Sequence, residues 1–446
     1  MASLTYTSSP IKYGIEDLIE RRQNCDDFCY FLKHYSPTVY KYRTTESPEQ
    51  IKKHVLNCEK TQYVISQVAR ENDEDVKTVE ERARLIVEEM AAHIGMGTLR
   101  SFGYILSKLM RQLYSNINVN RQGIEKLRAA VEEHPVVYMP THRSYVDFIL
   151  LSYVCFLYGL PMPVVATGLD FMGMGGMNSL LRNCGSFFIR RSFVNDKLYW
   201  NIFSEYVQVH LRNGVPPVEF FIEGTRSRSG KSLVPKFGFL STIAEPFFKT
   251  QLLDVVVVPI TISYERTLEE SLYAFEMLGV PKPPESTKGL FKVRQILNQN
   301  FGKIHFNVAE PIALSEFCKL KMYKRIHHPG PKLLFSLTQD EQNFCKDLAY
   351  HIVRQHQAHS VISPFVLIAS LLLTYLQVGK RCISLNEFSE RLSWLKDLIS
   401  QLGGSICWKD GETSEHVLRN CVSVHGSIVE VKPDLESSQL FIHPVT

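Results

Sequence analysis

Residues 135–148, PVVYMPTHRSYVDF, mark the point where the pattern of the chain changes from helical to alternating. The β-branched run PVVYM begins at a proline and predicts a buried strand. The next run, residues 145–159 (YVDFILLSYVCFLYG), is almost entirely apolar and predicts a buried helix. The few polar residues between them therefore predict a turn that leads from a strand directly into a helix.

The same alternation continues downstream. Further buried strands are predicted in four short β-branched or aromatic runs: PMPVVA (161–166), GSFFIRR (185–191), PVEFFIEG (217–224) and LDVVVVPITISY (253–264). Helical sequence lies between them, as in residues 197–214. Strands that alternate with helices are typical of an α/β domain with a largely parallel sheet, which we place at residues 131–313.

The regions on either side of this domain have different patterns. Residues 1–130 read as helical and predict an N-terminal helical domain. In residues 75–95 apolar side chains recur at helical spacing, and Gly95 or Gly97 is expected to end that helix. Residues 314–446 are mixed in pattern and form a predicted C-terminal region, with a surface loop expected around HHPGPK (327–332).

Composition sets limits on function. Of the 446 residues, 45% are hydrophobic and 22% charged, which excludes a disordered, collagen-like or small disulfide-rich protein. Fifty Lys and Arg against 46 Asp and Glu leave a net charge of +4. This charge predicts no nucleic-acid binding, so an anion site must come from a local cluster.

The ten cysteines predict neither a metal site nor a disulfide framework. Only Cys25 and Cys29 lie close together, and no CxxC pair is present. The N-terminal sequence has no apolar run of secretory length. We therefore expect reduced thiols in an intracellular protein.

Two uncharged stretches bear on membrane contact. Residues 148–169 are interrupted by Gly159 and two prolines, which predicts a helix followed by a strand. A helix over residues 364–378 would be roughly 22 Å long, short of the about 30 Å of a bilayer core. Both are expected to be core or interfacial segments. Residues 364–378 and the apolar strip after Asp147 remain candidates for lipid contact.

His142 and Asp147 form the first candidate constellation. On a regular helix a spacing of five residues would point them apart. If His142 lies in the turn after the strand and Asp147 in the first helical turn, the carboxylate can reach the imidazole. This pairing suits a general base, because it fixes the tautomer and stabilises the imidazolium. A structural histidine remains an alternative on this pattern alone.

Arginines follow the next predicted strands. Arg190 and Arg191 come directly after SFFI, at a strand end where open α/β sheets bind ligands. Guanidinium groups there suit a phosphate, although a solvated pair is an equally good interpretation.

A second basic segment follows the strand at residues 217–224. Four cations, Arg226, Arg228, Lys231 and Lys236, surround one acid, Glu223. A phosphate or a coenzyme A tail would be attracted here. A P-loop is excluded because five residues, not four, separate Gly224 from Gly230. Farther along, Pro259 interrupts VVVVPITISY and predicts a sheet edge, a bulge or a site wall.

These four blocks, in this order, resemble the motifs of the glycerolipid acyltransferase superfamily: H-x4-D, G-x-F-F-I-R, E-G-T-R and V-P-I. Longer stretches resemble its dihydroxyacetone phosphate acyltransferase branch, and they cover nearly the whole chain: VYKY, MPTHRSYVDF, LDFMGMGGMNSLLRNCGSFFIRR, DKLYWNIFSEYVQVHLRNG, PVEFFIEGTRSRSGK, LEESLYAFEMLGVPKPPESTKGL and SPFVLIASLLL.

The resemblance implies a role for each motif. His142 would be the general base that deprotonates the acceptor hydroxyl, and Asp147 would orient it. Arg190 and Arg226 would hold the acceptor phosphate. The resemblance also assigns five further residues to the site. Pro259 would line its acyl-CoA side, and four residues would shape the pocket: Gly185, Glu223, Gly224 and Thr225. A thioester is already activated, so no metal and no cofactor beyond the co-substrate acyl-CoA is expected.

The implied activity is transfer of a long-chain acyl group to the hydroxyl of dihydroxyacetone phosphate, the first step of ether lipid synthesis. Glycerol-3-phosphate as acceptor is an alternative, and a non-catalytic lipid-binding or scaffold protein is another. The resemblance further implies peripheral contact with a membrane, the matrix side of the peroxisome and alkylglycerone phosphate synthase as a partner.

Two features depart from the family pattern. The sequence ends in IHPVT without an SKL-type tripeptide, whereas relatives continue further, so we expect a shortened chain. Ser186 stands where alanine is expected after Gly185, and we expect a mild effect.

Overall fold

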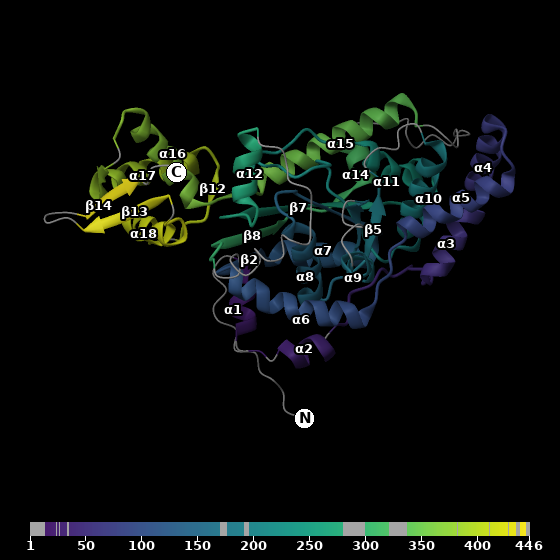
Figure 1. Ribbon diagram of the computed structural model, residues 1–446, viewed down its shortest axis with the longest axis horizontal. Helices are drawn as coiled ribbons and strands as arrows, with labels where there is room; N and C mark the ends of the chain where they lie inside the picture. The colour runs from purple at the N-terminus through teal and green to yellow at the C-terminus, as the bar shows by residue number, and fades with distance from the viewer. Residues whose placement is uncertain are drawn as a thin grey trace.

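The computed structural model describes residues 14–23, 25, 27–33, 35–169, 176–190, 196–279, 299–320, 337–380, 382–409, 411–426, 428–433 and 438–442. Its main body is a nine-stranded sheet with helices on both faces, and a smaller C-terminal unit lies beside it (Figure 1). The sequence outside the described residues includes residues 170–175, Arg191 and the predicted loop around residues 327–332.

The sheet is mostly parallel, as predicted. Its order is β1-β2-β8-β7-β3-β6-β4-β5, with β9 paired to β7. The pairs β2–β8, β3–β7, β3–β6, β4–β6 and β4–β5 are parallel, whereas β1–β2, β7–β8 and β7–β9 are antiparallel. The strands are β1 (Ile15–Asp17), β2 (Asn116–Asn120), β3 (Val136–Pro140), β4 (Val164–Gly168), β5 (Ser186–Ile189), β6 (Val218–Glu219), β7 (Val256–Tyr264), β8 (Lys303–Val308) and β9 (Ile312–Ala313).

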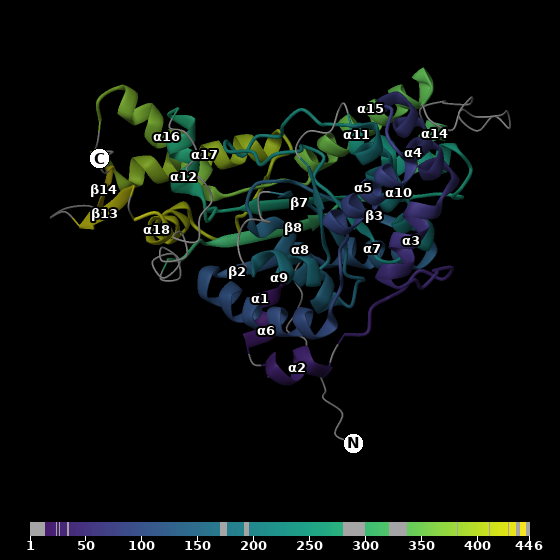
Figure 2. The ribbon, with the colours of Figure 1, turned by 45° about the vertical axis from the view of Figure 1, so that its right-hand side comes forward.

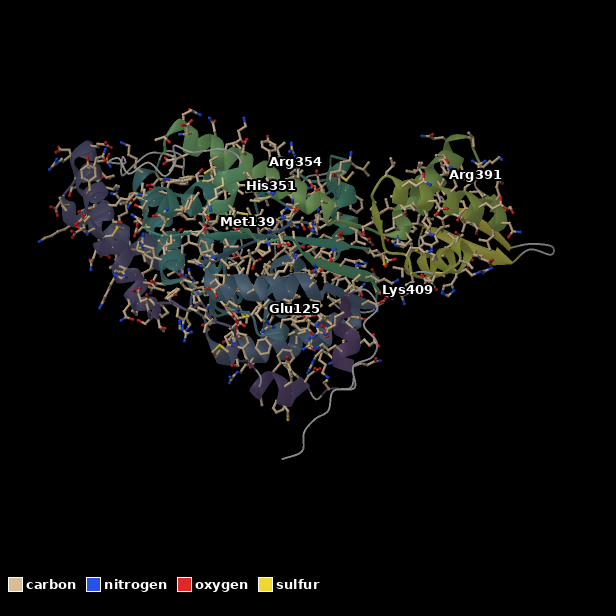
Figure 3. The ribbon with its side chains drawn as sticks, turned by 180° about the vertical axis from the view of Figure 1, so that it is seen from behind. Glu125, Met139, His351, Arg354, Arg391 and Lys409 are labelled. Atoms are coloured by element: carbon tan, nitrogen blue, oxygen red, sulfur yellow. The ribbon has the colours of Figure 1, made fainter. Side chains whose placement is uncertain are left out.

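Two hydrophobic cores lie on the two faces of this sheet. Side chains alternate along β3, so Val137 and Met139 face the first core and Val136 and Tyr138 face the second. Figure 3 shows Met139 between His351 of α15 on one side and Glu125 of α7 on the other. The first core takes residues from α3 (Pro48–Asn57), α4 (Glu59–Asn72), α5 (Val76–Met90), α10 (Lys197–Asn213), α11 (Gly238–Phe248), α14 (Leu314–Leu320) and α15 (Gln339–Ala358). The second takes residues from α1 (Leu18–Gln23), α2 (Asp27–Lys33), α6 (Met96–Leu113), α7 (Arg121–Glu133) and α8 (Val146–Tyr158).

The cores do not follow the predicted domain boundaries at residues 130 and 313. Strands β1 and β2 belong to the main sheet, and α3–α5 pack into the same core as α10. Helices α14 and α15 also belong to that core. A separate third core begins only with α16, so the chain divides near residue 360.

The C-terminal unit encloses this third core with three helices and short strands. In chain order its elements are β10 (Val361–Ile362), α16 (Pro364–Gln377), β11 (Cys382–Ser384), α17 (Leu385–Gln401), β12 (Ser405–Ile406), α18 (Ser414–Val424), β13 (Val429–Pro433) and β14 (Ser438–Ile442). It is joined to the main body by Arg266, whose guanidinium donates to the Val424 carbonyl at 3.0 Å. A cavity of about 230 Å³ lies at this junction.

Helix α5 ends earlier than predicted. Its buried stripe includes Val79, Ala83 and Met90, as the spacing indicated. The helix stops at Met90 because the following residues extend alongside α9 (Met177–Asn183), where the His93 and Gly95 amides donate to the carbonyls of residues 182 and 183.

Helix α8 is a core helix. It ends at Tyr158, and Gly159 closes it in the left-handed conformation at φ 60°. Nine of its residues are buried, so the expected lipid contact of the strip after Asp147 is wrong. No helix among the described residues is long and apolar enough to cross a bilayer.

Pro259 lies inside the sheet rather than at its edge. It pairs with Met139 of β3 on one side. On the other side the partner of β7 changes from β9 at residues 256–257 to β8 at residues 260–264. The Pro259 carbonyl accepts a hydrogen bond from the Ala309 amide at 3.0 Å, whereas the proline nitrogen carries no hydrogen to donate. The proline is therefore placed where the antiparallel ladder is interrupted.

Candidate active site

The predicted pairing of His142 with Asp147 is present. His142 lies in the turn after β3 and Asp147 in the first turn of α8. Nδ1 of His142 donates to Oδ2 of Asp147 at 2.9 Å. The Asp147 side chain is fully buried, whereas the His142 side chain is 17% exposed. The geometry is that of an imidazole oriented by a carboxylate.

The Asp147 carboxylate is held by three further donors. Oδ2 accepts bonds from the backbone amides of Arg143 at 2.7 Å and Ser144 at 2.9 Å. Oδ1 accepts a bond from the Tyr264 hydroxyl at 2.7 Å. Such donors stabilise the ionised form of a buried carboxylate.

The other edge of the His142 ring is open. Its face stacks on Phe221, with ring centroids 3.8 Å apart and an angle of 17° between the planes. Nδ1 is engaged by Asp147, and Nε2 has no hydrogen bond to any described residue. Because Nδ1 carries the proton, Nε2 is the basic nitrogen that can receive one.

Glu223 braces the turn rather than facing open solvent. One oxygen accepts a bond from the Arg143 guanidinium at 2.6 Å, and the other accepts one from the Leu233 amide at 2.9 Å. The side chains of Arg143 and Glu223 are 12% and 1% exposed. Arg143 is a site residue that the motif analysis missed, although it directly follows His142.

Arg226 lies beside the same turn. Its guanidinium is 3.5 Å from the centre of the Tyr145 ring and donates to the Tyr273 hydroxyl at 3.0 Å. The Glu269 carboxylate lies 3.9 Å from the Arg226 guanidinium. It accepts hydrogen bonds from the Ser144 hydroxyl and the Tyr145 amide, and burial raises its pKa. Tyr273 belongs to α12 (Glu270–Met277), so this helix connects Arg226 to the dyad.

Arg190 lies apart from these residues. It follows β5, and three strand spacings of about 4.8 Å place it roughly 14 Å from the chain that carries His142. Its guanidinium donates twice to Glu89 of α5, at 3.1 and 2.8 Å, and it stacks over the Tyr199 ring. The two arginines expected to share a phosphate have no contact with each other among the described residues. Each lies beside an acid: Arg190 is 2.8 Å from Glu89, and Arg226 is 3.9 Å from Glu269.

The glycines of the site have backbone roles. Gly185 has φ +97°, and a Cβ there would lie 2.6 Å from the Pro163 carbonyl oxygen, so only glycine fits without a shift. Gly224 has φ +66° in the turn that leads to Thr225, which is exposed. Ser186 is buried in β5.

Glu219 is a buried carboxyl group that the motif analysis did not single out. It pairs with Tyr138 in the register of β3 and β6, and its side chain is fully buried. Neither of its oxygens has a hydrogen-bond partner among the described residues. Burial, with a contribution from Asp147, raises its pKa well above the ordinary value.

Replacing Glu219 with glutamine should remove a pH-dependent cost in stability. With its raised pKa, the folded protein retains a proton that the unfolded chain releases above about pH 4.5. The wild type therefore loses stability as the pH rises above about 4.5, whereas glutamine does not titrate. Between about pH 5 and 8, we expect the difference in melting temperature, Glu219→Gln minus wild type, to increase by about 3 °C or more. Thermal denaturation across this range, with exposed Glu132→Gln as control, tests it. A difference that is constant with pH would contradict it.

Comparisons with known proteins agree with the geometry. An acyltransferase family model matches residues 118–263, and a model of the glycerol-3-phosphate acyltransferase C-terminal region matches residues 273–445. The chain is 43% identical over 420 residues to a dihydroxyacetone phosphate acyltransferase of Bos taurus and 42% to that of Homo sapiens, each match covering 94% of this chain. A glycerol-3-phosphate acyltransferase of Pseudomonas fluorescens is 38% identical over 256 residues, 57% of this chain and 30% of that protein.

The match to the mammalian relatives runs through all four motifs, from the dyad turn to β7. The chain spans 61% of the length of these relatives. The chain therefore contains an acyltransferase domain and a glycerol-3-phosphate acyltransferase C-terminal region, and its sequence is similar to those of the dihydroxyacetone phosphate acyltransferases.

Proposed function

We propose that the protein transfers a long-chain acyl group from acyl-CoA to the hydroxyl of dihydroxyacetone phosphate, the first step of ether lipid synthesis. One observation carries the proposal: His142 is held by Asp147 through Nδ1, and Nε2 is left open. The choice of acceptor is supported by relatives named for dihydroxyacetone phosphate, which match 94% of the chain.

In the proposed reaction, Nε2 of His142 takes the proton of the acceptor hydroxyl as its oxygen attacks the thioester carbon. Asp147 stabilises the imidazolium that forms. When the tetrahedral intermediate collapses, the carbon–sulfur bond breaks, and the imidazolium returns the proton to the departing thiolate. We propose no metal and no cofactor beyond acyl-CoA, because a thioester is already activated. General base catalysis contributes about 10²–10⁴-fold to such a step.

We propose Arg226 as the main ligand of the acceptor phosphate, since it lies against the dyad turn. Arg190 reaches a phosphate only by leaving Glu89, so its role is secondary in this proposal. Gly185, Gly224 and Thr225 would shape the pocket, Glu223 would support it through its carboxylate, and Pro259 would line the acyl-CoA side.

Glycerol-3-phosphate is the second candidate acceptor, favoured by the family model that matches residues 273–445 and by the Pseudomonas relatives. It differs from dihydroxyacetone phosphate only in having an alcohol at carbon 2. A non-catalytic scaffold is a third candidate, but it gives no chemical reason for an ordered dyad.

A coenzyme A release assay separates these candidates. The protein is given palmitoyl-CoA with dihydroxyacetone phosphate or glycerol-3-phosphate in parallel, and His142→Ala serves as the blank. Faster release with the ketone supports the proposal, and faster release with the alcohol moves the protein to the other acceptor. No release by folded protein with either acceptor would favour the scaffold.

We further propose peripheral contact with a membrane through the outer face of α12. Phe275, Met277 and the following Leu278 are 58%, 63% and 81% exposed, whereas Tyr273 on the same helix contacts Arg226. In both views α12 stands at the end of the sheet nearest the C-terminal unit (Figures 1 and 2). Such a surface would bring the active site close to the source of acyl chains and to the lipid product.

Replacing these three side chains with serine should weaken binding to phosphatidylcholine vesicles that contain phosphatidylserine. Each apolar side chain contributes up to about 1.5–3 kcal/mol when buried, so we expect at least a tenfold loss. Sedimentation with vesicles measures it, and Leu253→Ser, at a side chain that is 100% exposed elsewhere, is the control. Equal binding of the triple variant and the control would exclude α12 as the contact.

The matrix side of the peroxisomal membrane and alkylglycerone phosphate synthase remain proposals of location and partner. They are supported by the resemblance to the dihydroxyacetone phosphate branch. Fractionation of cells and co-purification with the synthase test them directly.

A further inference from the structure

Tyr264 makes a direct contact with the catalytic pair that no motif predicts. It is the last residue of β7, and its hydroxyl donates to Oδ1 of Asp147 at 2.7 Å. His142 binds the other oxygen, Oδ2, at 2.9 Å. The two side chains therefore hold the carboxylate from opposite oxygens.

The Tyr264 phenol is itself fixed in place. Its backbone pairs with Ile304 in the register of β7 and β8. Its ring packs near Tyr114, with centroids 6.5 Å apart, in the second core. Burial and the neighbouring Asp147 raise its pKa well above the ordinary value, so it remains a protonated donor at any working pH.

We propose that Tyr264 is a positioning residue for acyl transfer: its hydroxyl holds the Asp147 carboxylate in the rotation at which Oδ2 faces Nδ1 of His142. The inference rests on the proposed function, because it assigns a role in that same site. Without the phenol, Asp147 keeps three donors on Oδ2 and none on Oδ1. The carboxylate can then rotate, and the imidazole loses its fixed orientation.

Charged and titratable groups from several elements lie around Asp147. Glu219 of β6 and Glu269 before α12 are acids, and Tyr114 after α6 is a phenol, each electrostatically coupled to Asp147. Arg143 is the neighbouring cation, and its guanidinium is bound to Glu223. None of these groups replaces the Tyr264 donor. Its removal therefore leaves Oδ1 of Asp147 without a hydrogen bond from any described residue.

The test is Tyr264→Phe, with Tyr114→Phe as the matched control. The Tyr114 hydroxyl is buried in the same region and has no hydrogen-bond partner among the described residues. For Tyr264→Phe we expect kcat to fall by about 10–100-fold with KM for both substrates nearly unchanged. In proton NMR, the downfield resonance of the His142 Nδ1 proton, which reports its hydrogen bond to Asp147, should move or broaden. Tyr114→Phe should leave all of these at wild-type values.

A rescue separates positioning from packing. Tyr264→p-aminophenylalanine keeps a donor at the same position on the ring and should restore kcat in part. If the phenylalanine variant fails to fold, this variant is the test protein, and its His142 Nδ1 proton resonance should lie close to that of the wild type.

Several results would overturn the inference. Unchanged kcat and an unchanged His142 Nδ1 proton resonance in Tyr264→Phe would do so, as would the same changes in Tyr114→Phe. So would a p-aminophenylalanine variant whose Nδ1 proton resonance lies away from that of the wild type. If the wild type releases no coenzyme A with either acceptor, the proposed function fails. The His142 Nδ1 proton resonance then still decides whether Tyr264 positions the pair.

Discussion

His142→Ala should lower kcat for palmitoyl transfer by about 10²–10⁴-fold or more and leave KM for both substrates almost unchanged. The imidazole is oriented by Asp147 at 2.9 Å, and its Nε2 has no hydrogen bond to any described residue. The substitution therefore removes the proton acceptor. It also removes the stack on Phe221 and one of the four described donors to Asp147, so a small loss of stability is expected beside the loss of turnover. Coenzyme A release measures kcat, and thermal denaturation should show a melting temperature within a few degrees of the wild type.

His54→Ala is the matched control for this variant. His54 lies on α3 with its side chain 65% exposed, paired with Glu46 far from the dyad in the sequence. It should keep wild-type turnover. If His142→Ala also kept near-normal turnover, another group would have to be the base, and the proposed mechanism would be abandoned.

Arg226→Ala should raise KM for dihydroxyacetone phosphate by about 10–100-fold, with a smaller change in kcat and none in KM for acyl-CoA. A charge-assisted hydrogen bond to a phosphate is worth about 1.5–3 kcal/mol, which corresponds to that range. The aromatic cradle of Tyr145 and Tyr273 holds the guanidinium, so little of its orientation has to be established on binding. Steady-state kinetics with each substrate varied in turn measures the split.

The acceptor itself supplies a control for Arg226. Dihydroxyacetone, which lacks the phosphate, should react equally slowly with the wild type and with Arg226→Ala. Arg228→Ala is the matched variant, since Arg228 lies on the same loop but is bound to Glu276 and is 47% exposed. It should change KM far less. A loss of kcat at constant KM in Arg226→Ala would assign Arg226 to the support of the dyad turn instead.

Local sequence patterns were sufficient to predict the sheet and the dyad. The strand before His142, the buried helix after it and the reach of Asp147 back to the imidazole all depend on residues close in the chain. The parallel sheet followed from five runs of β-branched or aromatic residues. What these patterns could not show was that β1 and β2, far away in the sequence, complete the same sheet.

The contacts that sequence reasoning missed all join distant segments. Glu89 lies 101 residues from Arg190, and Tyr264 lies 117 residues from Asp147. A lone acid on an amphipathic helix, or a tyrosine at a strand end, has no pattern that identifies its partner. For the same reason the sequence does not show that the Arg190 guanidinium is bound to the carboxylate of Glu89.

The cavity at the junction with the C-terminal unit affects how well the dyad is shielded from bulk water. Tyr264 lines that cavity, and its hydroxyl also donates to Asp147. The outer walls come from α16 and α18, through residues such as Pro364 and Val424. A chain that ended before α16 would admit bulk water behind the phenol and raise the local dielectric constant around the buried carboxylate. The field that Asp147 exerts on His142 would then weaken, although every motif of the active site was still present.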